Sequence, residues 1–311
     1  YNGVTTGQNL DDQRSSEELI AEAVEKARLA DCVVMFGGLN KSDFQDCEGH
    51  DRKEYALPYG QDNVIEALAK VNANMVYVNI SGNAVAMPWR DQVPAIVQGW
   101  FLGSEAGEAL AAVLTGDANP SGKLPFTWVK SLKQVGAHVL DSYPGVWRKP
   151  GGAQTPDNII DEDYKEGIYV GYRWTDLKRE RPEFAFGHGL SYTTFAISNL
   201  RADKAVMDRN DSIAFTVTVK NTGLRAGAET VQLYIHDRKA SVDRPVKELK
   251  GFSKVWLEPG ESRDVTIAID NSALCFYDES QSAWRSENGT FEAWVGNASD
   301  NLKLKKAFEL K

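Results

Sequence analysis

The chain has 311 residues, which is longer than one hydrophobic core usually supports and therefore predicts two domains. A hydrophobic content of 42% and a charged content of 25% exclude a disordered, collagen-like or coiled-coil protein. The formal net charge of −9 repels nucleic-acid phosphates and anionic lipid, which disfavours both as partners. No apolar stretch approaches the ~20 residues that a membrane span needs.

The first third of the chain alternates helical and strand patterns. Ser15 and Glu18 have the spacing of a capping box, and apolar residues at helical spacing follow them as far as Ala27. Strands are predicted at 32–36, 75–80, 95–100 and 124–128, and helices at 61–71 and 105–114, the last one closed by Gly116. Apolar strands separated by amphipathic helices indicate a mostly parallel α/β sheet. Three or four such strands are too few for an eight-stranded barrel.

The pattern changes twice in the remainder of the chain. Residues 130–163 are rich in Pro-Gly and Pro-Asp pairs, which predicts a loop longer than is usual within a compact domain. Beyond Tyr192 the apolar period becomes two, with strands predicted at 213–219, 231–235, 255–257, 265–269 and 291–295. About seven such strands indicate a β-sandwich of fibronectin-III or immunoglobulin size. We therefore predict an incomplete α/β domain at 1–129, a loop and bridge at 130–195, and an all-β domain at 196–311.

The most informative segment for chemistry is the predicted loop between Phe36 and Leu57. Ligands of open α/β sheets bind beyond the carboxyl ends of the strands, and this loop holds five carboxylates. Glu48 stands beside Gly49, which allows close backbone approach, and near Arg52, which has the charge to tune a neighbouring carboxylate. From the residues alone, a solvated acidic loop remains the alternative to a catalytic one.

Other kinds of site have little support in the sequence. The chain has no Gly-x-Ser-x-Gly elbow and no phosphate-binding loop, which disfavours serine hydrolases and nucleotide chemistry. The three histidines other than His50 are scattered in the sequence, and we find no Cys or His pair at ligand spacing, so the sequence predicts no metal site. The cysteines Cys32, Cys47 and Cys275 cannot all pair with one another, which leaves the redox compartment open. The chain opens at Tyr1 without signal-peptide features, which indicates a processed product or a fragment.

A series of motifs resembles glycoside hydrolase family 3. The α/β part of that resemblance comprises Gly38-Leu39-Asn40, Asp46-Cys47-Glu48-Gly49-His50-Asp51-Arg52, Gly103-Ser104-Glu105-Ala106-Gly107 and Asn119-Pro120-Ser121-Gly122-Lys123-Leu124-Pro125. The later part comprises Phe186-Gly187-His188-Gly189-Leu190-Ser191-Tyr192-Thr193 and Lys247-Glu248-Leu249-Lys250-Gly251-Phe252. The motifs cover nearly all of the chain in the family's order. The resemblance implies an α/β sandwich followed by a fibronectin-III-like domain.

The resemblance also implies which residues act. The family's full architecture includes a barrel domain that carries an Asp nucleophile, and that barrel is missing from this chain. The loop that corresponds to 36–57 supplies the acid/base carboxylate, which by motif is Glu48, with Phe44, Asp46 and Arg52 as candidate substrate-binding residues. His50 stands where the family usually has an aromatic residue, and this loop varies between members. Asp46 and Glu54 therefore remain alternatives for the acid.

The expected activity is that of an exo-acting, retaining β-glucosidase, of which this chain is the C-terminal portion and by itself inactive. The implied partners are a β-linked oligosaccharide or β-glucoside and the missing barrel domain, which belongs to the same polypeptide or to a separate chain. No metal or organic cofactor is implied. A β-xylosidase or exoglucanase of the same family is the nearest alternative, and a non-catalytic module that binds carbohydrate or protein is a more distant one. A periplasmic or secreted location follows from the resemblance alone.

Overall fold

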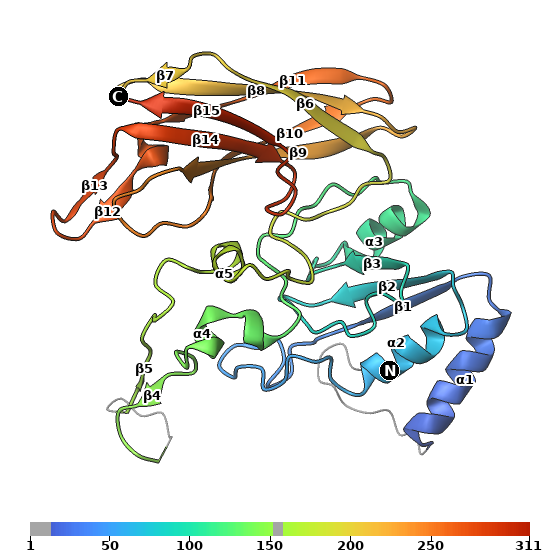
Figure 1. Ribbon diagram of the computed structural model, residues 1–311. Coiled ribbons are helices and arrows are strands. Elements are labelled where there is room, and N and C mark those ends of the chain that lie inside the picture. Colours follow the sequence, from blue (N-terminus) through green and yellow to red (C-terminus); the bar gives the residue numbers. More distant parts are fainter. Residues whose placement is uncertain (1–13, 152–157) are drawn as a thin grey trace. The chain divides into compact units, whose positions relative to one another are not determined.

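The computed structural model describes residues 14–151 and 158–311, which form two compact units divided between Leu114 and Thr115. Within these described ranges, every helix is too short or too polar to cross a membrane. The first unit is an α/β structure and the second is mainly a β-sandwich (Figure 1). The predicted order of fold classes, α/β and then all-β, is therefore confirmed.

The first unit has a parallel sheet of three strands. Its elements in chain order are α1 (Ser16–Leu29), β1 (Val33–Gly38), α2 (Gln61–Ala69), β2 (Met75–Ile80), β3 (Ala95–Gln98) and α3 (Ala106–Thr115). The strands lie in the order β1-β2-β3, and both neighbouring pairs are parallel. The carboxyl ends of all three strands therefore lie at the same edge of the sheet, which is where the loop after β1 begins.

The first helix starts as its sequence predicts. The Ser15 hydroxyl accepts a hydrogen bond from the backbone N–H of Glu18, and the Glu18 carboxylate accepts one from the N–H of Ser15. This reciprocal pair satisfies two backbone donors that the first turn would otherwise leave without partners. At the other end of α1, the Asn72 amide donates to the carbonyls of Ala27 and Ala30, which ties this helix to the end of α2.

The core of the first unit lies between α2 and β2. Ile65 and Leu68 of α2 are buried, as are Met75 and Tyr77 of β2. The ring of Tyr77 meets that of Trp89 edge to face at 4.7 Å, a favourable geometry for two aromatic rings. This packing fixes β2 at the centre of the sheet.

The strand predicted at 124–128 is absent from the sheet, so that prediction was wrong. Its residues belong to the second unit, where Trp128 forms an isolated bridge with Phe184 and Leu124 exchanges backbone hydrogen bonds with Gly187 and His188. An apolar run reveals that a segment is buried but does not identify its partner. Here the partner is a segment about sixty residues further along the chain.

The second unit contains two facing antiparallel layers. One has the order β10-β9-β14-β15-β7, in which β7 pairs with β15 in parallel, and the other has the order β11-β8-β6. The strands are β6 (Phe195–Ala202), β7 (Val206–Met207), β8 (Ser212–Asn221), β9 (Gly227–Asp237), β10 (Glu248–Leu257), β11 (Ser262–Asp270), β14 (Gly289–Gly296) and β15 (Leu304–Leu310). Phe215 of β8 packs on Phe308 of β15 in the core between the layers. The predicted β-sandwich is confirmed.

The rest of the second unit consists of short elements. They are η1 (Leu132–Gln134), α4 (Gly136–Val139), β4 (Val146–Trp147), β5 (Ile160–Asp161), α5 (Tyr172–Lys178), η2 (Asn271–Leu274), β12 (Phe276–Asp278) and β13 (Ala283–Arg285). The helix α5 is bonded to the start of β10, because the Tyr172 hydroxyl accepts from the N–H of Leu249 and Arg173 pairs with Glu248 at 2.9 Å. The segment before the sandwich is thus held to it by specific contacts.

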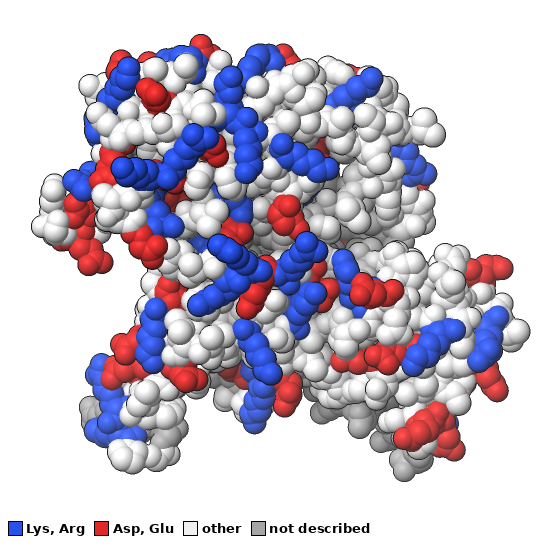
Figure 2. Space-filling model, viewed as in Figure 1, with Lys and Arg blue, Asp and Glu red and all other residues white. Residues whose placement is uncertain are grey.

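Positive and negative side chains are interspersed on the face of the molecule drawn in Figure 2. Ion pairs within the second unit join strands or turns, such as Arg201 of β6 with Asp264 of β11 at 2.5 Å and Lys204 with Asp211 at 2.6 Å. Exposed pairs of this kind contribute little to stability because solvent screens them.

Candidate active site

The loop that follows β1, residues 39–60, is anchored at both ends. Leu39 and Leu57 are buried, and the N–H of Leu39 donates to the carbonyl of Ile80 at 2.8 Å. The Gln61 amide bonds both backbone groups of Gly38, each at 2.8 Å. The loop therefore leaves and re-enters the fold at fixed points, and the residues between those points lie at the carboxyl edge of the sheet.

Asp46 ties this loop to the loop that follows β2. One carboxylate oxygen accepts from the N–H of Gly82 at 2.6 Å, and the other accepts from the Asn83 amide at 2.8 Å. Each oxygen of Asp46 thus has a partner inside the protein. Asp46 was predicted to bind substrate, and any contact with a sugar hydroxyl would have to share these oxygens.

Arg52 makes a second tie to the same segment. Its Nη2 donates to the carbonyl of Ala84 at 2.6 Å, while Nη1 is buried and has no hydrogen-bond partner among the described residues. Burial lowers the pKa of the Arg52 guanidinium, and the charge of Asp46 partly offsets that effect. Arg52 therefore offers one unused donor from a fixed position.

A pocket of about 290 Å³ opens between the two loops. Its lining residues are Lys41, Gln45, Asp46, Cys47, His50, Asp51, Arg52, Gly82 and Asn83. The loop after β3 lies close by, because the Lys41 ammonium sits 4.0 Å from the centre of the Phe101 ring. The pocket has the location at which open α/β sheets bind their ligands.

Glu48 is exposed and is not itself among the lining residues, but Cys47 before it and His50 after it both line the pocket. Its carboxylate has no hydrogen bond or ion pair to any residue in the described ranges, and the neighbouring Gly49 has open space around its Cα. Glu54, the alternative acid that lies outside the pocket lining, is also exposed. Of the loop's carboxylates, Glu48 is the one that is both unpaired and flanked by pocket residues, and its catalytic role stays a prediction.

Phe44, the predicted platform for a sugar, is 41% exposed and has a left-handed backbone at φ 62°. The Lys53 ammonium lies 3.7 Å from the centre of its ring, and the His50 ring is tilted against it at 5.0 Å. A sugar could stack on this ring where Lys53 now lies only if that flexible side chain moved aside. Phe44 is not among the residues that line the pocket, although its neighbour His50 is, and its role in binding stays a prediction.

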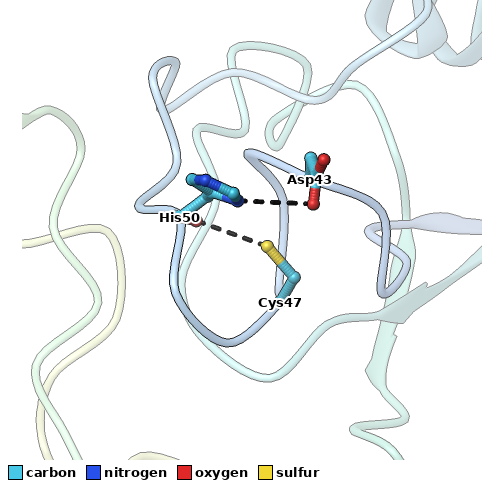
Figure 3. Close-up of side chains that lie close together, drawn as sticks. All are labelled: Asp43, Cys47 and His50. Carbon is cyan, nitrogen blue, oxygen red and sulfur yellow. Dashed lines mark hydrogen bonds and ion pairs between the residues drawn. The ribbon is translucent and has the colours of Figure 1, made fainter.

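Three side chains of this loop that the sequence did not group lie together in the structure. Asp43, Cys47 and His50 place one oxygen, one sulfur and one nitrogen atom within 4.8 Å of one another. Figure 3 shows the three side chains converging, with His50 Nδ1 3.4 Å from Asp43 Oδ1. Cys47 and His50 are separated by two residues, a spacing that is itself a local signal for this cluster, and the prediction of no metal site overlooked it.

Comparison with protein families matches two parts of the chain. Residues 2–172 match the glycosyl hydrolase family 3 C-terminal domain, and residues 229–299 match a fibronectin type III-like domain. The first match covers more than half of the chain. It includes the whole loop described above.

Curated relatives and solved structures agree with these matches. The chain is 48% identical over 299 residues to the β-glucosidase BoGH3A of Bacteroides ovatus, and this alignment covers 96% of the chain and 38% of that protein. It is 41% identical over 301 residues to the thermostable β-glucosidase B of Acetivibrio thermocellus, again covering 38% of the relative. The chain therefore spans about two fifths of the length of these relatives.

Two solved β-glucosidases have the same fold over nearly the whole chain. The enzyme of Bifidobacterium adolescentis gives a TM-score of 0.85 at 36% identity, with 97% of this chain and 42% of that one covered. The Kluyveromyces marxianus enzyme, solved in complex with glucose, gives 0.83 at 37% identity, with 96% and 34% covered. The family match and these relatives together show that the chain belongs to glycosyl hydrolase family 3 and represents the C-terminal portion of such a protein.

Proposed function

We propose that this chain is the C-terminal portion of an exo-acting, retaining β-glucosidase, in which Glu48 is the general acid/base. The observation that carries the proposal is the position of Glu48. Its carboxylate is exposed and unpaired, between Cys47 and His50, which line the pocket at the carboxyl edge of the sheet. The β-glucosidase names of the relatives support the substrate class, a terminal β-D-glucosyl residue.

A retaining glycosidase needs two carboxyl groups about 5 to 5.5 Å apart. One attacks the anomeric carbon, while the other protonates the leaving oxygen and later removes a proton from the attacking water. In this proposal Glu48 performs the second role, and the nucleophile belongs to a barrel domain outside this chain. An exposed carboxylate on an anchored loop suits a site that a second domain completes, because the loop holds its position while Glu48 stays accessible.

The neighbouring residues suggest how the sugar is held. Arg52 lines the pocket, and its buried, unpartnered Nη1 becomes a donor for a sugar hydroxyl once the side chain turns toward the pocket. The ring of Phe44 becomes a surface for the leaving-group sugar once Lys53 moves aside. Asp46, with both oxygens engaged, keeps the loop in place and contacts sugar only by sharing its bonds. Binding and positioning are thus divided among three residues around Glu48.

The test is azide rescue in the whole protein. Glu48→Ala should lower turnover of 4-nitrophenyl β-glucoside by ~10² to 10⁴, the usual contribution of general acid/base catalysis, and azide should restore turnover with a β-glucosyl azide product. Glu54→Ala is the matched control, since Glu54 is an exposed carboxylate of the same loop. Full activity of the Glu48 variant, or rescue of the Glu54 variant instead, would overturn the assignment. The chain alone should neither turn over the glucoside nor bind glucose; binding by the chain alone would favour a carbohydrate-binding module.

A further inference from the structure

The cluster of Asp43, Cys47 and His50 is unused by the proposed reaction and has the composition of a metal site. It combines a carboxylate, a thiol and an imidazole, and the three donor atoms lie within 4.8 Å of one another. The side chains of His50 and Asp43 are 55% and 74% exposed, so they can adjust without disturbing a core. All three residues come from one anchored loop, and each side chain points toward the other two (Figure 3).

We propose that Asp43, Cys47 and His50 bind Zn²⁺ and that this binding inhibits the enzyme. Zinc takes sulfur, nitrogen and carboxylate ligands in a tetrahedron, at about 2.3 Å for sulfur and 2.0 to 2.2 Å for the others. Ligand atoms on such a tetrahedron are about 3.3 to 3.8 Å apart. The nitrogen and oxygen atoms of His50 and Asp43 are already 3.4 Å apart, so mainly the sulfur has to move. Water would take the fourth position.

The donor set selects against the common hard cations. Mg²⁺ and Ca²⁺ prefer oxygen ligands, whereas a thiolate together with an imidazole favours zinc and other soft transition-metal ions. The loop between 39 and 60 carries five carboxylates and three cations, so an added divalent ion meets a net negative segment. Coordination replaces the hydrogen bond from Cys47 Sγ to the carbonyl of His50, now 3.4 Å long, and the thiol proton passes to water.

The inhibition follows from where the ligands lie in sequence. Cys47 precedes Glu48, and His50 follows it after one glycine, so a metal held by both fixes the backbone on either side of Glu48. A cation at this position also attracts the carboxylate that the reaction needs for proton transfer. This part of the proposal rests on the proposed function, whereas the binding of zinc does not.

Binding is tested on this chain in a Cys32→Ser/Cys275→Ser background, which leaves Cys47 as its single thiol. Titration with Co²⁺ should give a thiolate-to-metal charge-transfer band at one equivalent, and Zn²⁺ should remove that band. Cys47→Ser should abolish the band, and His50→Gln and Asp43→Asn should each weaken Zn²⁺ binding at least tenfold by calorimetry. Glu54→Gln, which neutralises an exposed carboxylate outside the cluster, should change the affinity less than threefold. Absence of the band, or equal Zn²⁺ affinity in the His50 and Asp43 variants, would overturn the site.

Inhibition is tested on the whole protein by measuring glucosidase activity with and without Zn²⁺ for each variant. Zn²⁺ should lower the glucosidase activity at least tenfold in the parent protein and in Cys32→Ser, and a chelator should restore that activity. In Cys47→Ser and His50→Gln, the activity with Zn²⁺ should stay close to the activity without it. Equal inhibition of all variants would refute the regulatory role. If the whole protein binds Zn²⁺ through Cys47 but hydrolyses no β-glucoside, the proposed function fails and the metal site stands.

Discussion

The carboxylate of Asp46 accepts a 2.6 Å hydrogen bond from the backbone N–H of Gly82, which joins the loop after β1 to the loop after β2. Two further bonds continue the junction, from Arg52 to the carbonyl of Ala84 and from the N–H of Ala86 to the carbonyl of Tyr55 at 2.9 Å. These hydrogen bonds hold the two loops together, and Glu48 is an exposed residue of the first loop.

Replacing Asp46 should loosen this junction. Asp46→Ala removes the acceptor for Gly82 and Asn83, and hydrogen bonds to a charged group are worth about 1.5 to 3 kcal/mol each before solvent screening is considered. We expect the amide of Gly82 to exchange with deuterium at least tenfold faster in the variant. Glu54→Ala, which alters an exposed carboxylate of the same loop, should leave that rate unchanged. Equal protection of Gly82 in both variants would show that the junction does not depend on Asp46.

Gly38 and Gly49 are a matched pair of glycines for testing whether the start of the loop requires a residue without a side chain. Gly38 has φ +130°, and a Cβ there would lie 2.0 Å from the carbonyl oxygen of Ile80, whereas Gly49 has φ +89° and open space. Gly38→Ala should therefore destabilise the first unit by more than about 4 kcal/mol, because β1 cannot pair with β2 without moving. Gly49→Ala should cost only the backbone strain, about 1 to 2 kcal/mol. Urea denaturation of the two variants measures the difference, and similar midpoints would contradict this account of Gly38.

The sequence predicted the elements whose signals are local. The strand β2 has the predicted bounds, Met75–Ile80, because its apolar run is continuous, and the capping box placed the start of α1. The strand β1 extends two residues further than predicted, since Gly37 and Gly38 continue the pairing without an apolar side chain to reveal it. The strand predicted at 124–128 failed because its partner lies far along the chain.

The site could be predicted only in part for a similar reason. Loop position and residue type singled out Glu48, but nothing local indicated that Asp46 bonds Gly82 across 36 residues. The convergence of Cys47 with Asp43 depends on the path of a loop that contains Phe44 in a left-handed conformation, which its residue type disfavours. The spacing of Cys47 and His50 is a local signal, but tertiary contacts decide the path that brings Asp43 beside them, so spacing alone could not predict the third residue.

Arg52→Lys tests whether the unused guanidinium nitrogen contacts substrate. A lysine keeps the positive charge, but it lacks the planar guanidinium whose two nitrogens can donate to the Ala84 carbonyl and to a sugar hydroxyl at once. We expect KM for a β-glucoside to rise about 10- to 100-fold in the whole protein, as loss of one hydrogen bond to a charged group would give, with a smaller change in kcat. Arg90→Lys, an exposed arginine of the same unit, should leave both constants unchanged. A change in kcat alone would indicate that Arg52 positions Glu48 and does not bind sugar.

Glu248 joins α5 to the β-sandwich, and its replacement should destabilise the second unit. Its carboxylate bonds Arg173 at 2.9 Å and Arg244 at 2.8 Å, and its side chain is 14% exposed. Glu248→Gln leaves the Arg173 guanidinium without its carboxylate partner and leaves Arg244 with Asp237 alone, at 3.3 Å. We expect the free energy of unfolding at about pH 7 to fall by about 3 kcal/mol, measured by urea denaturation. Glu258→Gln, on the exposed turn after β10, should stay within about 0.5 kcal/mol of the parent.

The same variant should respond differently to acid. Burial acts to raise the pKa of Glu248, but Lys250, Arg244 and Arg173 outweigh it and hold the pKa below the ordinary value of 4.5. A carboxyl whose pKa is depressed by folding contributes stability above its unfolded value, and that contribution is lost as pH falls through the folded value. The difference in free energy of unfolding between the parent and Glu248→Gln should therefore become smaller as the pH is lowered below 4.5. A difference that stays constant with pH would mean that Glu248 stabilises the junction through packing, because only a charge interaction depends on its ionisation.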